Sequence, residues 1–118
     1  MDGIVEKTLR YDFYGELLTA RQREIYEAVV FNDMSLSEAA EQYGVSRQGI
    51  SDMIRRSDKA MAEYEDKLHS IRQYRTVVRN VGRLKEAVKA MHLSDQEKET
   101  ILSIADAIGN SMRDNDGI

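Results

Sequence analysis

The stretch "SLSEAAEQYGVSRQGISDMIRR", residues 35–56, carries start and stop signals for two helices that follow each other closely. Ser35 and Glu38 have the spacing of a capping box, in which each side chain accepts a hydrogen bond from the other residue's backbone N–H. Gly44 fits a helix C-cap, because glycine adopts a positive φ at little steric cost. Ser46 then fits the N-cap of a second helix. Two helices joined by so short a turn are typical of a helix-turn-helix.

Side-chain sizes in the same stretch agree with this interpretation. Ala40, four residues before Gly44, is small enough to lie where two helices cross at a steep angle. The apolar residues expected between the two helices are Ala39, Tyr43, Val45, Ile50 and Met53. The combined spacing predicts a helix-turn-helix, whose second helix lies in the major groove of DNA in the proteins that use it for binding.

The flanking sequence also reads as helical, since the 118 residues include no proline and only seven glycines. A first helix is expected over 4–18, with an apolar stripe of Val5, Leu9, Phe13 and Leu17 and with Tyr14 and Leu18 beside it. Thr19 and Gln22 form a second capping box, which predicts a helix through Phe31.

Beyond Ile50 the apolar residues step by three and four as far as Met91, except at polar Ser57, as in a heptad seam with a phase slip at 71–74. Ser94 opens another capping box before a last amphipathic helix. We therefore predict an all-α fold: a helix-turn-helix core, a long following helix and a C-terminal helix. The expected domains are 1–59 for the helix-turn-helix, 60–112 for the extension, dimerising and packed on the same domain, and 113–118 for a frayed tail.

A straight helix over 47–91 would run roughly 65–70 Å, about twice the diameter of a compact domain of this length. The helix is therefore either broken near His69, Gly82 or His92, or it projects and buries its seam against a second copy of the chain. The residues predicted for such a dimer interface are Tyr64, Leu68, Ile71, Val78 and Val81. A two-fold dimer would also present two recognition helices to a palindromic DNA site.

The net charge of −4 is unevenly distributed along the chain. Residues 1–45 carry −5, residues 46–89 carry +5 and residues 90–118 carry −4. Salt screens charges that lie more than about 8–10 Å apart, so the local charge decides short-range contacts. The acidic total does not exclude a basic surface that faces DNA.

Two resemblances fit these observations. "LLTARQREIYEAVVFNDMSLSEAAEQYGVSRQGI" resembles region 4 of bacterial sigma factors, a helix-turn-helix that reads DNA. "EKTLRYDFYGELLTARQ" and "SLSEAAEQYGVSRQGISDMIRRSDKAMAEYEDKL" are similar to the YlxM family of helix-turn-helix proteins, over about residues 5–90. The second resemblance implies a small all-helical bacterial protein. It also implies a regulatory part in the signal recognition particle pathway, because genes of this family commonly lie beside those of the particle.

The residues predicted to bind nucleic acid lie on the exposed side of the second helix. Arginine pairs with guanine and glutamine with adenine at base edges, whereas hydroxyls and further cations suit phosphates. The set is Ser46, Arg47, Gln48, Ser51, Arg55, Arg56 and Lys59. Asp52 on the same face opposes DNA, since a carboxylate repels phosphate. The alternative is that this charged face is simply solvated.

Other function classes find little support in the sequence. There is no cysteine, the two histidines lie far apart in sequence, and no apolar run is long enough to cross a membrane. We predict a cytoplasmic protein that is not an enzyme, uses no cofactor or metal and has no membrane partner. Regulatory binding to DNA is favoured. The alternative is a structural or interaction dimer that does not bind DNA and instead binds the protein or RNA of the signal recognition particle.

Overall fold

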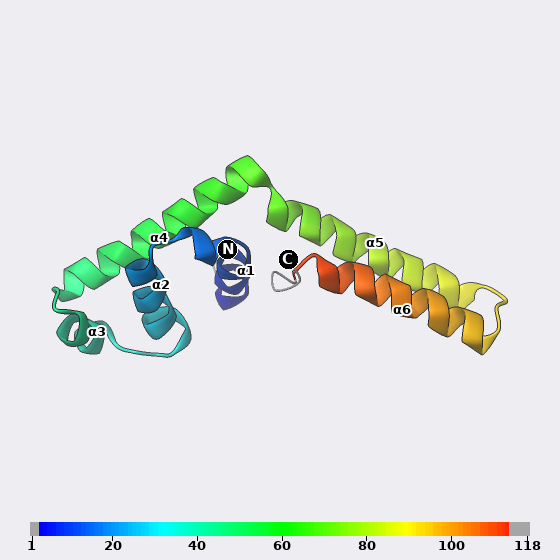
Figure 1. Cartoon of the computed structure of the whole chain (residues 1–118), viewed down its shortest axis with the longest axis horizontal. Helices are drawn as coiled ribbons and strands as arrows, with labels where there is room; N and C mark the ends of the chain where they lie inside the picture. The colour runs from blue at the N-terminus through cyan, green and yellow to red at the C-terminus, as the bar shows by residue number, and fades with distance from the viewer. Residues whose placement is uncertain (1–2, 114–118) are drawn as a thin grey trace. The chain divides into compact units, whose positions relative to one another are not determined.

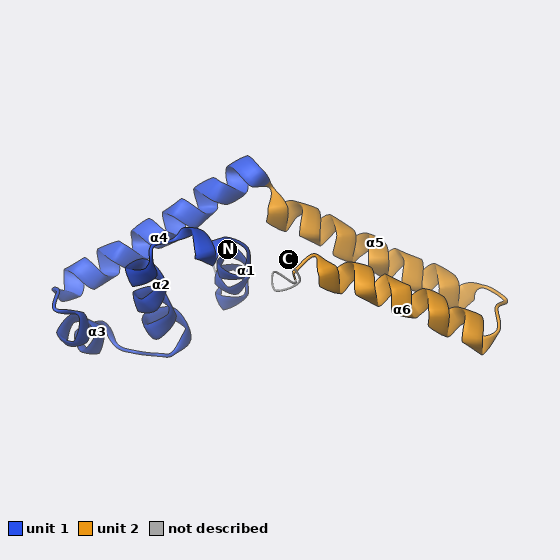
Figure 2. Cartoon of the chain, viewed as in Figure 1, with its two compact units in different colours: residues 1–68 blue, residues 69–118 orange. Residues whose placement is uncertain are grey.

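The computed structural model describes residues 3–113, and all regular structure in that range is helical. The helices in chain order are α1 (Ile4–Tyr14), a 3₁₀ turn η1 (Gly15–Leu17), α2 (Ala20–Tyr26), a π-helical turn η2 (Glu27–Phe31), α3 (Leu36–Tyr43), α4 (Arg47–Leu68), α5 (Ser70–Ala90) and α6 (Asp95–Ser111) (Figure 1). The all-α prediction is confirmed. The chain forms two compact units, residues 1–68 and 69–118 (Figure 2).

Local capping signals fix the starts of three helices where the sequence predicts them. The capping boxes pair Thr19 with Gln22, Ser35 with Glu38 and Ser94 with Glu97. The hydrogen bonds in these boxes measure between 2.9 and 3.1 Å. Because each box satisfies two backbone N–H groups that have no partner within the helix, it defines the first helical turn without distant contacts.

The first helix differs from its predicted range. The α-helix ends at Tyr14, and the chain continues through the η1 turn to Leu17. Tyr14 and Leu18 are buried, whereas Val5 and Leu17 of the predicted stripe are exposed. The tighter 3₁₀ turn advances each residue by about 120° rather than 100°, so from Gly15 onward the periodicity of an α-helix no longer predicts which side chain faces the core, and Leu17 is exposed.

The helix-turn-helix core lies where α2, α3 and α4 meet. Ile25, Ala39 and Ile50 are fully buried there, one from each helix. Ala40, the small residue expected at the crossing, is only partly buried. Ala39 therefore occupies the tighter position.

Tyrosines and carboxylates join α1, α2 and α4 in the rest of unit 1. The ring of Tyr26 is fully buried and stacks on Tyr11 at 5.5 Å. Its hydroxyl donates to Asp58 Oδ1 at 2.5 Å, and Lys7 Nζ donates to Asp58 Oδ2 at 3.0 Å. Tyr14 likewise donates to Glu65. Several negative charges of unit 1 thus have partners within the unit, rather than all lying free on its surface.

The long helix is broken at His69, one of the three positions that the sequence offered. His69 has φ 59° and ψ 23°, a left-handed conformation that ends α4 and begins α5. Gly82 lies within a continuous α5. Unit 1 extends to Leu68, beyond the predicted range 1–59, because α4 keeps packing on α1 through Tyr64 and Glu65. Most of the predicted tail, residues 114–118, lies outside the described residues.

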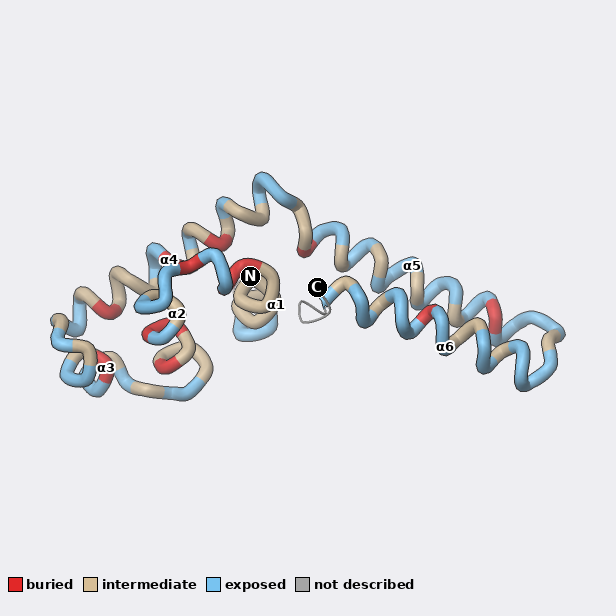
Figure 3. Tube along the Cα trace, viewed as in Figure 1, coloured by how far each residue is buried: buried red, intermediate tan, exposed pale blue. Residues whose placement is uncertain are grey.

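Unit 2 is an antiparallel hairpin of α5 and α6 (Figure 1). Its buried apolar residues are Ile71, Val88 and Ala105, whereas Val78 and Ile108 are among several exposed apolar residues (Figure 3). A two-helix hairpin has no third layer to cover its apolar side chains, so this exposure follows from the architecture.

Candidate nucleic-acid interface

The turn between α3 and α4 has the geometry of a tight helix-turn-helix connection. Gly44 adopts φ 69° and ψ 34°, and its N–H donates to the carbonyl of Ala40. Val45 N–H donates to the same carbonyl at 3.1 Å. The buried residue Ile50 then fixes the inner face of α4, so the opposite face of its first turns is left to solvent.

The structure places the predicted binding residues along this outer part of α4. Arg47 and Gln48 are exposed in its first turn, and Ser51 follows half-buried. Arg55 and Lys59 are exposed further along, and Arg56 is exposed at the flank. At 1.5 Å per residue the set spans about 20 Å. The exposed members of the set therefore lie along the first half of α4.

Ser46 serves as the N-cap of α4. Its Oγ accepts a hydrogen bond from the N–H of Gly49 at 2.9 Å. Since Oγ acts only as acceptor in that bond, its own O–H proton remains available to an external acceptor such as a phosphate oxygen. A Cβ added at Gly49 would lie 3.2 Å from Ser46 Oγ, so the glycine leaves room for the cap.

Asp52 organises the middle of the surface. Its Oδ1 accepts from Gln48 Nε2 at 3.1 Å and pairs with Arg55 Nη2 at 2.8 Å. The carboxylate thus holds two of the predicted binding side chains in place and neutralises one of them. A nucleic acid would have to compete with Asp52 for Arg55.

The turn geometry, together with a second helix that exposes Arg47, Arg55 and Lys59, is that of the helix-turn-helix proteins. The family model of UPF0122, described as "Putative helix-turn-helix protein, YlxM / p13 like", matches residues 3–104. The chain belongs to this family, and the match extends further than the range of about 5–90 noted from the sequence.

Several bacterial relatives agree along most of their length. The UPF0122 protein of Thermoanaerobacter sp. (strain X514) is 33% identical over 113 residues, which cover 96% of each chain. That of Geobacillus kaustophilus is 38% identical over 109 residues, covering 89% of this chain and 99% of the relative. That of Symbiobacterium thermophilum is 40% identical over 94 residues, covering 80% and 88%. No solved structure matches the chain.

Residues 3–113 contain neither a candidate membrane span nor a candidate metal site. No helix in that range combines the length and the apolar character that a membrane crossing requires. In the same range, histidine and acidic side chains nowhere gather in threes in an arrangement that could hold a metal ion.

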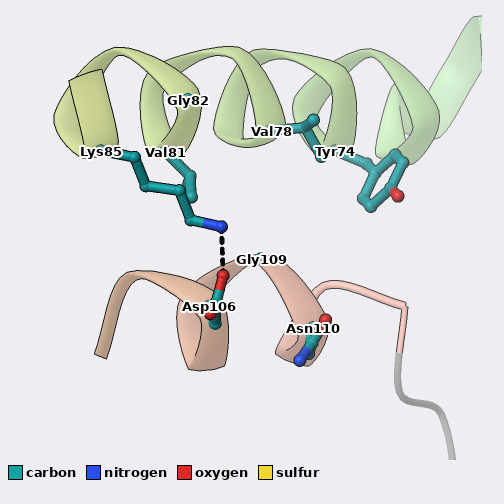
Figure 4. Close-up of a pocket in the computed structure, with 8 residues that line it drawn as sticks. All are labelled: Tyr74, Val78, Val81, Gly82, Lys85, Asp106, Gly109 and Asn110. Carbon is teal, nitrogen blue, oxygen red and sulfur yellow. Dashed lines mark ion pairs between the residues drawn. The ribbon is translucent and has the colours of Figure 1, made fainter. Parts of the chain in front are cut away.

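A groove between α5 and α6 is the feature that the sequence did not predict (Figure 4). Its apolar lining comes from Tyr74, Val78 and Val81, and Lys85 and Asp106 form an ion pair across it. Gly82 and Gly109 also line the groove, and an added Cβ at either would meet no atom within 4 Å. The sequence does contain one hint of this groove, since each of the two helices has a glycine in its interior. A glycine there destabilises a helix, so it points to a requirement of packing or function.

The residues predicted for a dimer interface differ in accessibility. Leu68 and Val78 are 54% and 44% exposed. Val81 lines the groove, and Tyr64 packs against Tyr14 at 6.1 Å within unit 1. Ile71 is 4% exposed, so it is already covered within a single chain. Leu68, Val78 and Val81 remain the predicted contacts that a second copy could reach most easily.

Proposed function

We propose that this protein is a non-enzymatic, cytoplasmic regulator that binds DNA through α4. The observation that carries the proposal is the placement of Arg47, Gln48, Arg55 and Lys59 on the exposed side of a helix whose inner side is buried through Ile50. Such a helix can enter a major groove without disturbing its own core.

The position of each side chain suggests its role. Arg47 and Gln48 lie at the N-terminal end of α4, where recognition helices meet base edges, and so would read sequence. The phosphate contacts would come from Ser46, Ser51, Arg55, Arg56 and Lys59. Arg55 would leave Asp52 and bind a phosphate oxygen instead. Asp52 therefore lowers the affinity for DNA by competing for Arg55.

Fluorescence anisotropy with a selected duplex tests this assignment. Arg47→Ala and Arg55→Ala should weaken binding, whereas Asp52→Asn should strengthen it, because it removes a repulsive charge and releases Arg55. Lys67→Ala is the matched control, since Lys67 is an exposed cation of α4 outside the proposed surface. If a dimer made about six phosphate contacts, the log–log dependence of affinity on salt would have a slope near −5. Affinity that does not change between about 50 and 200 mM salt would contradict the proposal.

We further propose that the active form is a homodimer that uses the apolar residues of unit 2. The support is their exposure: Val78 and Leu84 on α5 and Ile104 and Ile108 on α6 remain open to solvent in the single chain. Contact with a second copy would remove these apolar side chains from water.

Asp52 also favours a second candidate, in which the helix-turn-helix has no DNA role. A carboxylate at the centre of the surface, bonded to Gln48 and Arg55, opposes a phosphate backbone. The resemblance to YlxM proteins then suggests the signal recognition particle, its protein or its RNA, as the partner. Retention of the particle on immobilised protein, with no preference among DNA duplexes, would favour this candidate.

A further inference from the structure

A second basic surface lies on α5, outside the helix-turn-helix. Arg72, Arg75, Arg79 and Arg83 follow one another at steps of three, four and four residues. At 100° per residue these steps place the four side chains within a sector of about 80°. All four are exposed. We call this set the arginine stripe.

The opposite side of α5 faces α6. Ile71 and Val88 are buried on that side, and Lys85 pairs there with Asp106 of α6. By helical geometry the arginine stripe lies on a different side of α5 from these residues. The single acidic residue of α5, Glu86, lies beyond the end of the stripe and pairs with Lys89 at 3.5 Å.

We propose that the arginine stripe is a contact surface for the phosphate backbone of a nucleic-acid duplex, independent of base sequence. The stripe extends the proposed function and rests on it for the identity of the polyanion. Arginine binds phosphate in a bidentate manner, and every cation of the stripe is arginine although lysines occur elsewhere on α5. From Arg72 to Arg83 the helix rises about 16 Å, close to five base-pair steps of about 3.4 Å.

The surroundings of the stripe favour nucleic acid over an acidic protein. The buried centre of a protein–protein interface is usually depleted of charged residues and richer in apolar ones. The exposed neighbour Thr76 is polar, and the exposed apolar residue Leu84 points away from the centre of the stripe by the same helical geometry, whereas Asn80 and Val78 lie at its two flanks. A phosphate backbone needs only charge and hydrogen-bond donors, which the stripe provides.

The test compares Arg79→Gln/Arg83→Gln with a charge-matched control, Lys67→Gln/Lys98→Gln, in the full chain. Glutamine keeps the helix propensity, and circular dichroism verifies the fold. Binding to a fluorescent DNA duplex of arbitrary sequence is measured between about 50 and 200 mM salt. Losing two phosphate contacts should reduce the magnitude of the log–log salt slope by about 1.8. Over this fourfold range the affinity of the unsubstituted protein should then fall about twelve times more than that of the variant.

The possible outcomes separate the stripe from the helix-turn-helix. If Arg79→Gln/Arg83→Gln shows the same salt slope of duplex binding as the control variant, while Arg47→Ala reduces the magnitude of that slope, the proposed role of the stripe is overturned and the proposed function stands. The reverse result supports the stripe and overturns DNA binding through α4. If Arg79→Gln/Arg83→Gln loses binding to polyglutamate but keeps its binding to the duplex, the partner of the stripe is an acidic protein. That result would also overturn the proposed contact with phosphates.

Discussion

Replacing Asp58 by alanine should be among the most damaging single substitutions at a polar residue of unit 1. Asp58 Oδ1 accepts from the buried hydroxyl of Tyr26 at 2.5 Å, and Oδ2 accepts from Lys7 Nζ at 3.0 Å. These contacts connect α4 with α2 and with α1. The substitution would remove the carboxylate that accepts from the Tyr26 hydroxyl, at a side chain that has no exposed surface in the parent structure.

The two contacts differ in their expected energies. A hydrogen bond to a charged group contributes about 1.5–3 kcal/mol. The side chains of Lys7 and Asp58 are 26% and 24% exposed, so solvent screens their ion pair and it contributes only about 0.2–1 kcal/mol. Asp58→Ala should therefore cost about 2–4 kcal/mol in the free energy of unfolding. A unit of 68 residues has roughly 3–10 kcal/mol in total, so this loss should be large enough to populate the unfolded state.

Urea denaturation followed by near-ultraviolet circular dichroism of the tyrosines measures this cost. Lys7→Met is the matched control and should cost less than about 1 kcal/mol. Tyr26→Phe removes the donor of the same hydrogen bond. The double variant Tyr26→Phe/Asp58→Ala should therefore lose at least about 1 kcal/mol less in the free energy of unfolding than the sum of the two single variants. Strict additivity, or an Asp58→Ala cost no larger than that of Lys7→Met, would refute the reasoning.

Three further outcomes are expected. Ala39→Leu should lower the free energy of unfolding by about 1–3 kcal/mol, and Ala40→Leu by less, because only Ala39 is fully buried; equal melting temperatures would place the tight crossing elsewhere. Hydrogen bonds from Ser35 lower the pKa of Glu38, so its contribution is present above the usual carboxyl pKa and is lost as the pH falls through the folded-state value. Glu38→Gln should therefore show a smaller decline in melting temperature between about pH 5 and 3 than the parent chain, and parallel curves would contradict this. Val78→Glu and Ile108→Glu should reduce the mass in sedimentation equilibrium toward the 13.5 kDa of one chain; a parent protein that already has this mass would exclude the dimer.

Features encoded by neighbouring residues were predictable from the sequence. The capping box at Ser35 and the left-handed Gly44 involve residues a few positions apart, so their spacing alone identifies them. The exposure of Arg47 and Arg55 followed from the same helical periodicity that buries Ile50. The nucleic-acid role of these side chains remains a prediction.

Features that depend on distant residues were not predictable. The π-helical turn η2 places Phe31 against Tyr11 and Tyr26, at 5.3 and 5.7 Å. The periodicity of the sequence does not predict this turn, because contacts with another helix stabilise it. The bond between Tyr26 and Asp58 joins residues 32 positions apart, and only the tertiary structure brings them together.

The three capping boxes have a consequence for the rate at which this chain folds. Each box specifies a helix start within four residues, so α2, α3 and α6 can begin to form before any distant contact exists. Helical proteins with mostly local contacts fold in microseconds to milliseconds. The chain contains no proline, so refolding should lack the phase of tens of seconds that prolyl isomerisation produces. The N-terminal helices should therefore form early during synthesis, while the ribosome is still adding the rest of the chain at about 5–20 residues per second.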